Sequence, residues 1–566
     1  MKIPSGNTDA DLLQRQSFYE DILQKCTATQ SNRKEMYKVL KTYFLYGTDG
    51  TNSDTNQRWN KIKSHIETMC SFVYSQETTR FNVEVGASVS DLERRKTPAL
   101  NRSLRQDWNS SNADNIFGQS VLWSHVYASM FVKNRWRHDN AAAYVVEPHN
   151  FGVFREDVMG LSNQEAYSHT YFTTESQLHN ELVSGGMKPE MIAHIMENAQ
   201  ASRQDGIASS AGPMDRLIIS AVSPNLTGNA AMWNNDLTNL YKPKVSQPLV
   251  KMHELYVYND AIDDMQVVTL LGGAGLVVWD RPLERIFLKN ESPFVQVCPN
   301  PAYDYFWGYS EVEQLIPLQV MRNTRMKGIE HLMRLQERPP KTGMGMSGDM
   351  DEVALALNSE DGLVLEDNPS AKLDVHQPEI PDDLFASIKE IDLMFEEVSG
   401  INNIMQGRGE VGVRSTGHAS QLAKLGASRA KRRALIIEDC LEQEATLILK
   451  IKKRYDKRRF RADGPADKPG EEFIAAQFTD DFIVKVDAHS NSPIFMEDQE
   501  QKAVELFKLK AIDRESLLEM VEVPQRDLLI DRLKTKIEPQ EAAAHREQMA
   551  LEGAKAKPNG HAAHGG

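Results

Sequence analysis

Two helical stretches that follow each other closely in the chain most constrain how this protein can fold. Residues 310–337 carry apolar side chains at helical spacing, and this stretch stops at Arg338-Pro339-Pro340 because proline cannot continue a helix. Pro381-Asp382-Asp383 opens a second stretch, which ends at Ser399-Gly400. Its apolar face consists of Leu384, Ile388, Ile391, Phe395 and Val398. Two such helices hardly make a stable unit alone, so both faces need further packing partners.

The first stretch is also long. At about 1.5 Å per residue, a helix from Pro317 to Glu337 extends roughly 30 Å. Pro317 marks either the first turn of this helix or a kink in it. A third helix, which Ser415 or Thr416 can cap, is predicted from about His418 to Arg454.

Between the second and third helices lies INNIMQGRGEVGVRSTG (401–417), whose glycines Gly407, Gly409 and Gly412 have G-x-G-x-x-G spacing. A dinucleotide-binding turn with this spacing follows a strand, and an acidic residue stands about 20 residues later on a second strand. Here a helix precedes the glycines, and Lys431-Arg432-Arg433 occupies the later position. We therefore interpret the segment as a functional loop, and a nucleotide-binding enzyme using Gly407–Gly412 stays the less favoured alternative.

The remaining chain mixes helices and strands, so the predicted fold class is α+β and mainly helical. The 566 residues suggest two to four domains. Helices are predicted over 10–46, 58–74 and 98–127. Strands are predicted over 130–136, 143–148, 216–222 and 252–260, with a hairpin about Gly272–Gly273. Further expectations are short helices within 160–212, a flexible loop at 343–352, a strand or turn at 361–368, strand-like structure at 472–488, and a helical block at 497–537 broken at Pro524.

Composition excludes several classes of protein. The sequence has no run of about eighteen apolar residues, so no membrane span is expected, and its N-terminus lacks the apolar core of a secretory signal. Its four cysteines lie far apart and suit buried free thiols in a reducing interior. The net charge of −15 disfavours a protein that holds nucleic acid tightly over its whole surface.

The charge is unevenly spread, because residues 401–461 hold fifteen Lys/Arg against six Asp/Glu. These cations could form a phosphate track. We favour instead a solvated helix face, paired at helical spacing with Glu438, Asp439, Glu442 and Glu444. His149, His253 and His331, and the acid pairs Asp263-Asp264 and Asp382-Asp383, fit no catalytic motif and are interpreted as structural. The sequence therefore predicts a protein that is not an enzyme, with no cofactor and no metal site.

The order of long helix, Pro/Gly-rich excursion, second helix, loop and very long third helix resembles the portal (head-to-tail connector) proteins of tailed bacteriophages. The resemblance covers most of residues 10–535 as an order of elements more than as signature residues. Four stretches carry it: WGYSEVEQLIPLQVMRNTRMKGIEHLMRLQERPP (307–340), FEEVSGINNIMQGRGEVGVRSTGHASQL (395–422), AIDRESLLEMVEVPQRDLL (511–529) and EPHNFGVF (147–154).

The resemblance implies a portal fold that assembles into a ring around a central channel. It also implies an assignment of the chain to parts of that fold. These are a wing (1–306), a first stem helix (307–337), a clip (338–381), a second stem helix (382–400), a tunnel loop (401–416), a long helix with the remaining wing (417–496), a crown (497–537) and a disordered tail (538–566).

Three groups of site residues follow from the resemblance. The DNA-facing tunnel loop would present Gln406, Gly407, Arg408, Gly409, Glu410, Gly412 and Arg414. The channel-lining stem would present Arg325, Lys327, Arg334 and Lys389. The clip would offer Arg338, Lys341, Asp349 and Asp351 to partners.

The partners implied are further copies of the chain in a dodecamer, double-stranded DNA in transient and sequence-independent contact, the terminase large subunit, the major capsid and scaffolding proteins, and tail adaptors. No membrane partner is expected. The location implied is the portal vertex of the virion, after assembly in the host cytoplasm. The remaining alternative is another structural virion protein, a tail adaptor or a scaffold.

Overall fold

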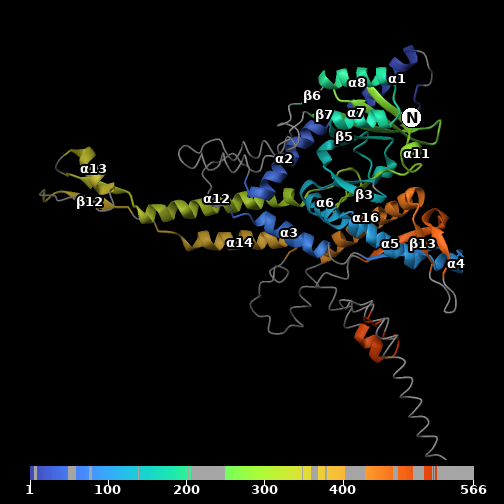
Figure 1. Cartoon of the computed structure of the whole chain (residues 1–566). Helices are drawn as coiled ribbons and strands as arrows, with labels where there is room; N and C mark the ends of the chain where they lie inside the picture. Colours follow the sequence, from blue (N-terminus) through green and yellow to red (C-terminus); the bar gives the residue numbers. More distant parts are fainter. Residues whose placement is uncertain are drawn as a thin grey trace, which may run out of the picture. The chain divides into compact units, whose positions relative to one another are not determined.

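The computed structural model divides into two compact units, Met1–His489 and Ser490–Gly566, and every element named below lies in the first unit. The residues that the structure describes are 1–4, 9–48, 59–74, 80–137, 139–201, 203–204, 249–273, 275–346, 349–358, 368–376, 379–401, 428–462, 470–487, 503–512, 514, 517–518 and 529. Figure 1 shows the elements of the chain.

The largest sheet is antiparallel, with the strand order β4-β5-β7-β8-β9. Its strands are β4 (Phe151–Val153), β5 (Ala166–Thr174), β7 (Leu249–Asn259), β8 (Asp264–Leu271) and β9 (Val277–Pro282), and the short β6 (Arg203–Gln204) also pairs with β7. The predicted hairpin about Gly272–Gly273 is confirmed, because β8 and β9 pair across it and Gly273 adopts a positive φ of 85°.

Side chains alternate along each strand, so this sheet has apolar side chains on both faces. Helices cover both faces. Helices α7 (Glu175–Ser184) and α8 (Pro189–Ala201) pack on the face that holds Val250 and Met252. Helix α1 (Asp9–Thr27) packs on the opposite face, against Leu255. The sheet and its helices thus bury one continuous strand, β7, from both sides.

A second sheet has the order β10-β2-β3 and packs beside a helical layer. Its strands are β2 (Met130–Arg137), β3 (Asn140–Val146) and β10 (Phe294–Val297). The layer contains α2 (Gln30–Tyr46), α3 (Lys61–Val73), α5 (Thr97–Ser110) and α6 (Ala113–Tyr127). The predicted helix over 98–127 is wrong as a single element, because Asn112 adopts a left-handed φ of 55° that separates α5 from α6.

The long helix α16 (Ser428–Tyr455) packs against α3 and against the small strand β15 (Phe482–Asp487). Strand β1 (Arg80–Val85) pairs with β15, and β13 (Arg459–Arg461) pairs with β14 (Glu472–Ile474). The shorter elements are α4 (Asp91–Arg94), η1 (Pro148–Asn150), η2 (Leu161–Asn163), α11 (Leu283–Ile286) and η3 (Ala475–Gln477). The strand-like prediction for 472–488 is confirmed.

The region 160–212 contains more than the predicted short helices. Its first part is β5, a central strand with the sequence AYSHTYFTT, which the sequence reading missed. The predicted loop at 343–352 is also wrong in part, since β11 (Lys341–Met344) and α13 (Met350–Asn358) occupy its two ends. The strand predicted at 216–222, and most of the segments predicted at 361–368 and 497–537, lie outside the described residues. The predicted α+β, mainly helical fold class is confirmed.

Candidate functional site: the helical pair and its root

The two long helical stretches form an antiparallel pair. Helix α12 (Glu311–Glu337) and helix α14 (Asp382–Ser399) lie side by side, and both agree with their predicted limits to within one residue. Ser310 caps α12 by accepting from Val312 N at 3.1 Å, and Gly400 ends α14 in a left-handed conformation. Pro317 lies inside α12, beyond its first turn.

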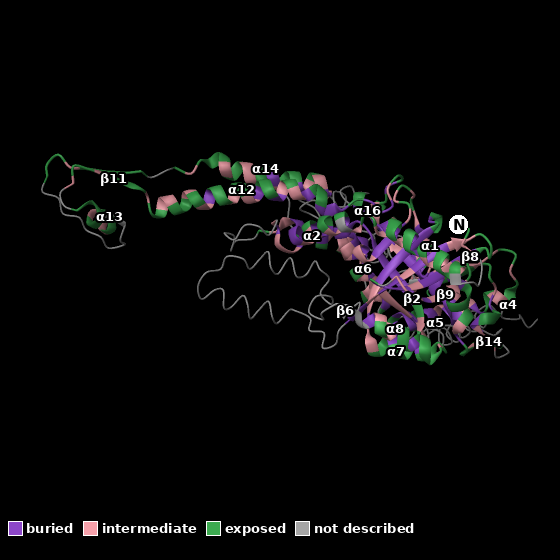
Figure 2. Ribbon diagram, turned by 90° about the horizontal axis from the view of Figure 1, so that it is seen from above, coloured by how far each residue is buried: buried purple, intermediate pink, exposed green. Residues whose placement is uncertain are grey.

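The root of the pair, where it enters the body, is apolar and fully packed. Val312 and Leu315 of α12 and Ile391 and Phe395 of α14 are buried in one cluster with side chains of α2, α3 and α6. His65 of α3 stacks on Phe395 with ring centroids 5.6 Å apart. Figure 2 shows buried residues at this root, while exposed and half-buried residues dominate the far part of both helices.

Polar side chains fix the root above this cluster. Gln319 accepts from Lys61 N at 3.1 Å and donates to Trp59 O at 2.9 Å, and Asn323 donates to Gly47 O at 2.6 Å. Because each bond joins α12 to backbone of the N-terminal layer, the helix cannot slide or rotate without breaking several of them.

The start of α16 contacts the first turn of α12 and the last turn of α14, both at the root. Arg433, which is half-buried, forms an ion pair with the buried Glu311 in the first turn of α12. Arg429 donates to the carbonyls of Glu397 and Val398, each at 2.9 Å, and so caps the last turn of α14. The Arg429 guanidinium, just after segment 402–427, thus binds the end of α14, just before that segment.

Two charged residues join the helices at the level where the pair leaves the body. Arg322 Nε of α12 donates to Asp392 Oδ1 of α14 at 2.9 Å, and Lys61 Nζ lies 3.1 Å from the same oxygen. The Arg322–Asp392 contact and the role of Gln319 were not predicted from the sequence. Polar residues at positions 319 and 322, on the apolar face that begins with Val312 and Leu315, could have indicated both.

The helical pair exposes apolar and charged side chains together along its length. Six large apolar residues are between 36% and 61% exposed, namely Val320, Met321, Met333, Phe385, Leu393 and Met394. The four predicted stem residues Arg325, Lys327, Arg334 and Lys389 are also exposed. Arg334 pairs with Glu330 one turn earlier, a surface interaction of little energetic value. A lone chain thus leaves much apolar surface of the pair in water.

A small subdomain lies beyond the far end of the pair. Strand β11 pairs antiparallel with β12 (Lys372–Val375), and α13 lies between them in sequence. All four predicted clip residues are exposed. Arg338 and Lys341 stand where α12 passes into β11, whereas Asp349 and Asp351 stand at the start of α13, where Asp349 Oδ1 accepts from Asp351 N at 3.3 Å.

The predicted tunnel-loop residues 406–410, 412 and 414 lie outside the described residues. The elements on both sides of them are described, and both are helices, α14 and α16. The nearest described element before the glycines is the helix α14, whereas a dinucleotide-binding turn follows a strand.

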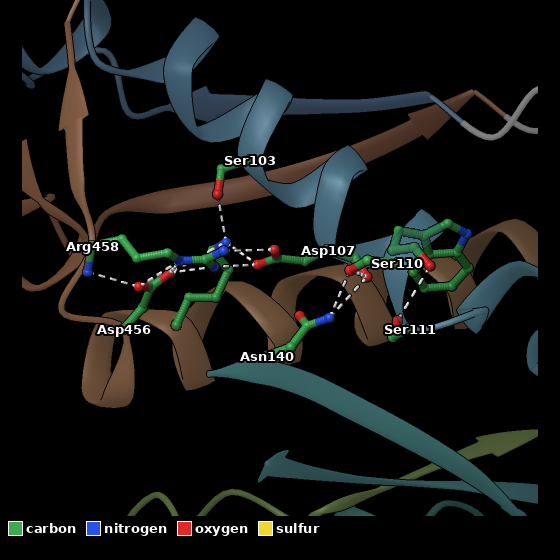
Figure 3. A network of polar contacts seen from close by, with 9 residues as sticks. Ser103, Asp107, Ser110, Ser111, Asn140, Asp456 and Arg458 are labelled. Atoms are coloured by element: carbon green, nitrogen blue, oxygen red, sulfur yellow. Dashed lines mark hydrogen bonds and ion pairs between the residues drawn. The ribbon is translucent and has the colours of Figure 1, made fainter. Parts of the chain in front are cut away.

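The basic run of α16 is paired with other elements, as shown by the buried network in Figure 3. Lys452 has no exposed side-chain surface, donates to Ser103 Oγ at 2.6 Å and pairs with Asp107 of α5. Arg458 reaches Asp107 Oδ2 at 2.8 Å and Asp456 Oδ2 at 2.6 Å. Although burial opposes it, the hydrogen bonds from Arg458 hold the pKa of Asp456 below its usual value.

These contacts correct the prediction that the basic residues of α16 form a solvated face paired within the helix. Lys450, Lys453 and Arg459 also pair outside α16, with Glu291, Asp480 and Glu472. The predicted partners at helical spacing are wrong for Glu442, which pairs with Lys485, and for Glu444, which accepts from Asn134. The run therefore ties α16 to the body, and its paired residues do not form a continuous phosphate track.

Of the histidines and paired acids singled out in the sequence, His149, His253 and Asp264 have structural contacts. His149 Nε2 lies 3.1 Å from Glu147, and His253 Nδ1 lies 2.9 Å from Thr170 Oγ1. Asp264 is buried and accepts from the backbone N–H groups of Glu284 and Asn290. Among the cysteines, Cys26, Cys298 and Cys440 are buried and Cys70 is half-buried, and all four are free thiols. Of the helices that the structure describes, none is both long and apolar enough to cross a bilayer.

A rooted helical pair with a small hairpin subdomain beyond it, followed by a segment whose flanks meet at the root, is the arrangement expected of a phage portal protein. The family model "Phage SU10 portal protein" matches residues 32–464, which is most of the chain. The chain therefore belongs to the phage SU10 portal family, and the predicted resemblance is confirmed. Comparison with curated proteins gives no match. The family is structural and not enzymatic, so the nucleotide-binding enzyme alternative is wrong.

Proposed function

We propose that copies of this chain form a closed dodecameric ring at one vertex of the capsid, and that duplex DNA passes through its axial channel during packaging and ejection. The observation that carries this proposal is the exposed apolar surface along α12 and α14. Copies arranged around an axis would bury that surface between neighbouring pairs. The family match supports the same conclusion.

In this ring, α12 and α14 form the stem, the subdomain of β11, α13 and β12 forms the clip, and residues 401–416 form the tunnel loop. Residues 1–306 and 417–496 contribute the wing, 497–537 the crown and 538–566 the tail. The anchored root supports this assignment, because a conduit under load needs its wall held by a rigid body. The Arg322–Asp392 pair and the Arg433–Glu311 pair supply that connection.

Contact with DNA in this proposal is weak and independent of sequence. Arg325, Lys327, Arg334 and Lys389 are exposed on helices that also carry exposed acids, such as Asp382 and Asp383. Mixed charge limits the number of phosphates that are neutralised at once, so a passing duplex meets no strong barrier. Gln406, Arg408, Glu410 and Arg414, with Gly407, Gly409 and Gly412, would add loose contacts from the tunnel loop.

The clip would dock the terminase large subunit first and the tail adaptors later, through Arg338, Lys341, Asp349 and Asp351. Exposed apolar side chains of the same subdomain, Met344, Met350, Leu355, Leu373 and Val375, would add the buried core of such an interface. Contacts with the major capsid and scaffolding proteins belong to the wing and crown.

Mass measurement of the purified protein, together with end-on electron micrographs, tests the ring. We expect a closed ring of many copies for the parent chain. Leu393→Asp, at a side chain that is 61% exposed on α14, should abolish it. Val183→Asp, at a 53% exposed aliphatic residue of α7, is the matched control and should assemble. A parent chain that stays a stable monomer at high concentration would refute the proposal.

A further inference from the structure

A cleft lies between the elbow of α1 and α2 and the face of the large sheet that α1 covers. Its volume is about 570 Å³, which is within the range of small-ligand sites. Strand residues of β5 and β7 form its floor, and helical residues form its walls. The side chains that matter here are Leu23, Lys34, Thr170, Phe172, Lys251 and His253.

The positions of these side chains follow from the fold. Lys251 and His253 stand on one face of β7, opposite Phe172 and Thr170 of β5 in the strand register. The rotation of α2 is fixed by the residue before Lys34, because Arg33 pairs with Glu156 and its guanidinium lies 4.1 Å from the centroid of the Trp307 ring. Lys34 and Lys251 therefore approach the cleft from two separate elements.

The charge in this cleft is not balanced. In the part of the chain that the structure describes, neither Lys34 nor Lys251 forms an ion pair, although buried cations elsewhere do, such as Lys133 with Glu254. Glu20 also lines the cleft, where it accepts a hydrogen bond from the uncharged Gln16 amide at 3.1 Å, so its single negative charge offsets only one of the two lysines. Burial, and then the charge of Lys34, lower the pKa of Lys251.

His253 adds a neutral polar group. Burial, and then Lys251, lower its pKa to about 4, so the ring is uncharged at neutral pH. When the Thr170 hydroxyl donates to Nδ1 across their 2.9 Å contact, Nε2 carries the proton and can donate to a ligand.

We propose that this cleft, the Lys34–Lys251 cleft, binds the phosphoryl group of a small phosphorylated molecule. The two ammonium groups and the His253 imidazole are several donors around a site of net positive charge, and a phosphoryl group offers them three terminal acceptor oxygens where a carboxylate offers two. The cleft is larger than a bare phosphate, and Phe172 and Leu23 offer apolar surface to the organic part of the ligand. This site lies apart from the helical pair and does not rest on the ring proposal.

Calorimetric titration of the full chain with inorganic pyrophosphate, at constant ionic strength set with sodium chloride, tests the site. We expect saturable binding, at least tenfold weaker in Lys251→Met and in Lys34→Met. Lys289→Met changes an exposed lysine elsewhere and should bind like the parent. Without ligand, Lys251→Met should melt no earlier than the parent, because the change removes a repulsion. This readout separates loss of the site from loss of the fold.

Two results would overturn the proposal. One is no pyrophosphate binding by the parent chain, or equal binding by the parent and both cleft variants. The other is binding of a short DNA duplex that needs Lys34 and Lys251 while pyrophosphate does not bind, since the cleft would then serve the phosphodiester backbone of nucleic acid.

Discussion

Arg322 on α12 and Asp392 on α14 join the two long helices through a hydrogen bond of 2.9 Å, at the level where the pair leaves the body. Arg322 is 7% exposed and Asp392 is partly exposed, with Lys61 of α3 at 3.1 Å from its carboxylate. Towards the body the helices are held by the apolar cluster, and further out the exposed apolar side chains are Met333 on α12 and Phe385 on α14. The Arg322–Asp392 ion pair thus ties both long helices to Lys61 of α3.

Arg322→Met should destabilise the root by about 1–3 kcal/mol, because Asp392 loses one of its two cationic partners in a partly desolvated position. Thermal unfolding followed by circular dichroism measures the change. Arg325→Met, at an exposed arginine one turn further on, is the control and should stay within about 0.5 kcal/mol of the parent. Equal losses in both variants would show that the Arg322–Asp392 contact adds nothing specific.

The buried Lys452–Asp107 contact should be worth more, because removing Lys452 leaves two buried carboxylates with only Arg458 as a partner. Lys452→Met is expected to cost about 3–5 kcal/mol. Lys457→Met, an exposed change on the same segment, should cost little. Adding Asp107→Asn to Lys452→Met should cost less than the two single changes together, and strict additivity would contradict the coupling.

Glu444 should make stability depend on pH. The side chain is 1% exposed on α16, and Asn134 Nδ2 donates to its Oε2 at 2.9 Å. Glu444 Oε1 and Asn134 Oδ1 are both buried without a hydrogen-bond partner. One proton on Oε1 would complete an acid–amide pair and satisfy both atoms. Burial accordingly raises the pKa of Glu444 to about 8 from a usual value of 4.5.

The sign follows from proton binding. Above pH 4.5 the unfolded chain releases this proton while the folded protein keeps it, so stability falls as pH rises towards about 8. The slope from this group is about 1.4 kcal/mol per pH unit. Glu444→Gln keeps both hydrogen bonds and should flatten the slope between pH 5 and about pH 8, measured by urea denaturation. Asp439→Asn, exposed on the same helix, should not. An unchanged slope in Glu444→Gln would sink this prediction.

Deletion of residues 405–414 should leave ring assembly intact and impair DNA packaging or retention. The reason is that the flanking helices are held independently, α14 by Phe395 in the apolar cluster and α16 by Arg433 on Glu311. Ring mass and packaged DNA per particle are the two measurements. A deletion of equal length at 555–564 is the control, and a monomeric 405–414 deletion would contradict the assignment of the loop.

The sequence predicted the helical pair well because each limit has a local cause. Ser310 caps α12, Pro339 follows its end, and Gly400 supplies the left-handed residue after α14. Sequence-based prediction failed where contacts between distant residues determine the structure. Strand β5 is rich in Ser, His and Thr, and its partners β4 and β7 satisfy that polar surface from distant parts of the chain.

The positions of the candidate site residues along the chain could be predicted from the sequence, but their contacts could not. The exposed cations of the stem and clip can be read from helix ends and polar positions. The ion pairs that anchor α16 join Lys452 to Asp107, more than three hundred residues apart in sequence, and no local spacing indicates such a contact. The tunnel-loop assignment stays a prediction, because those residues lie outside the described ranges.

The meeting of both flanks of segment 402–427 at Arg429 has an evolutionary consequence. Because entry and exit share one anchoring point, insertions or deletions within the segment need not displace either helix. We therefore expect related chains to differ in the length of segment 402–427 while α14 and α16 keep their positions.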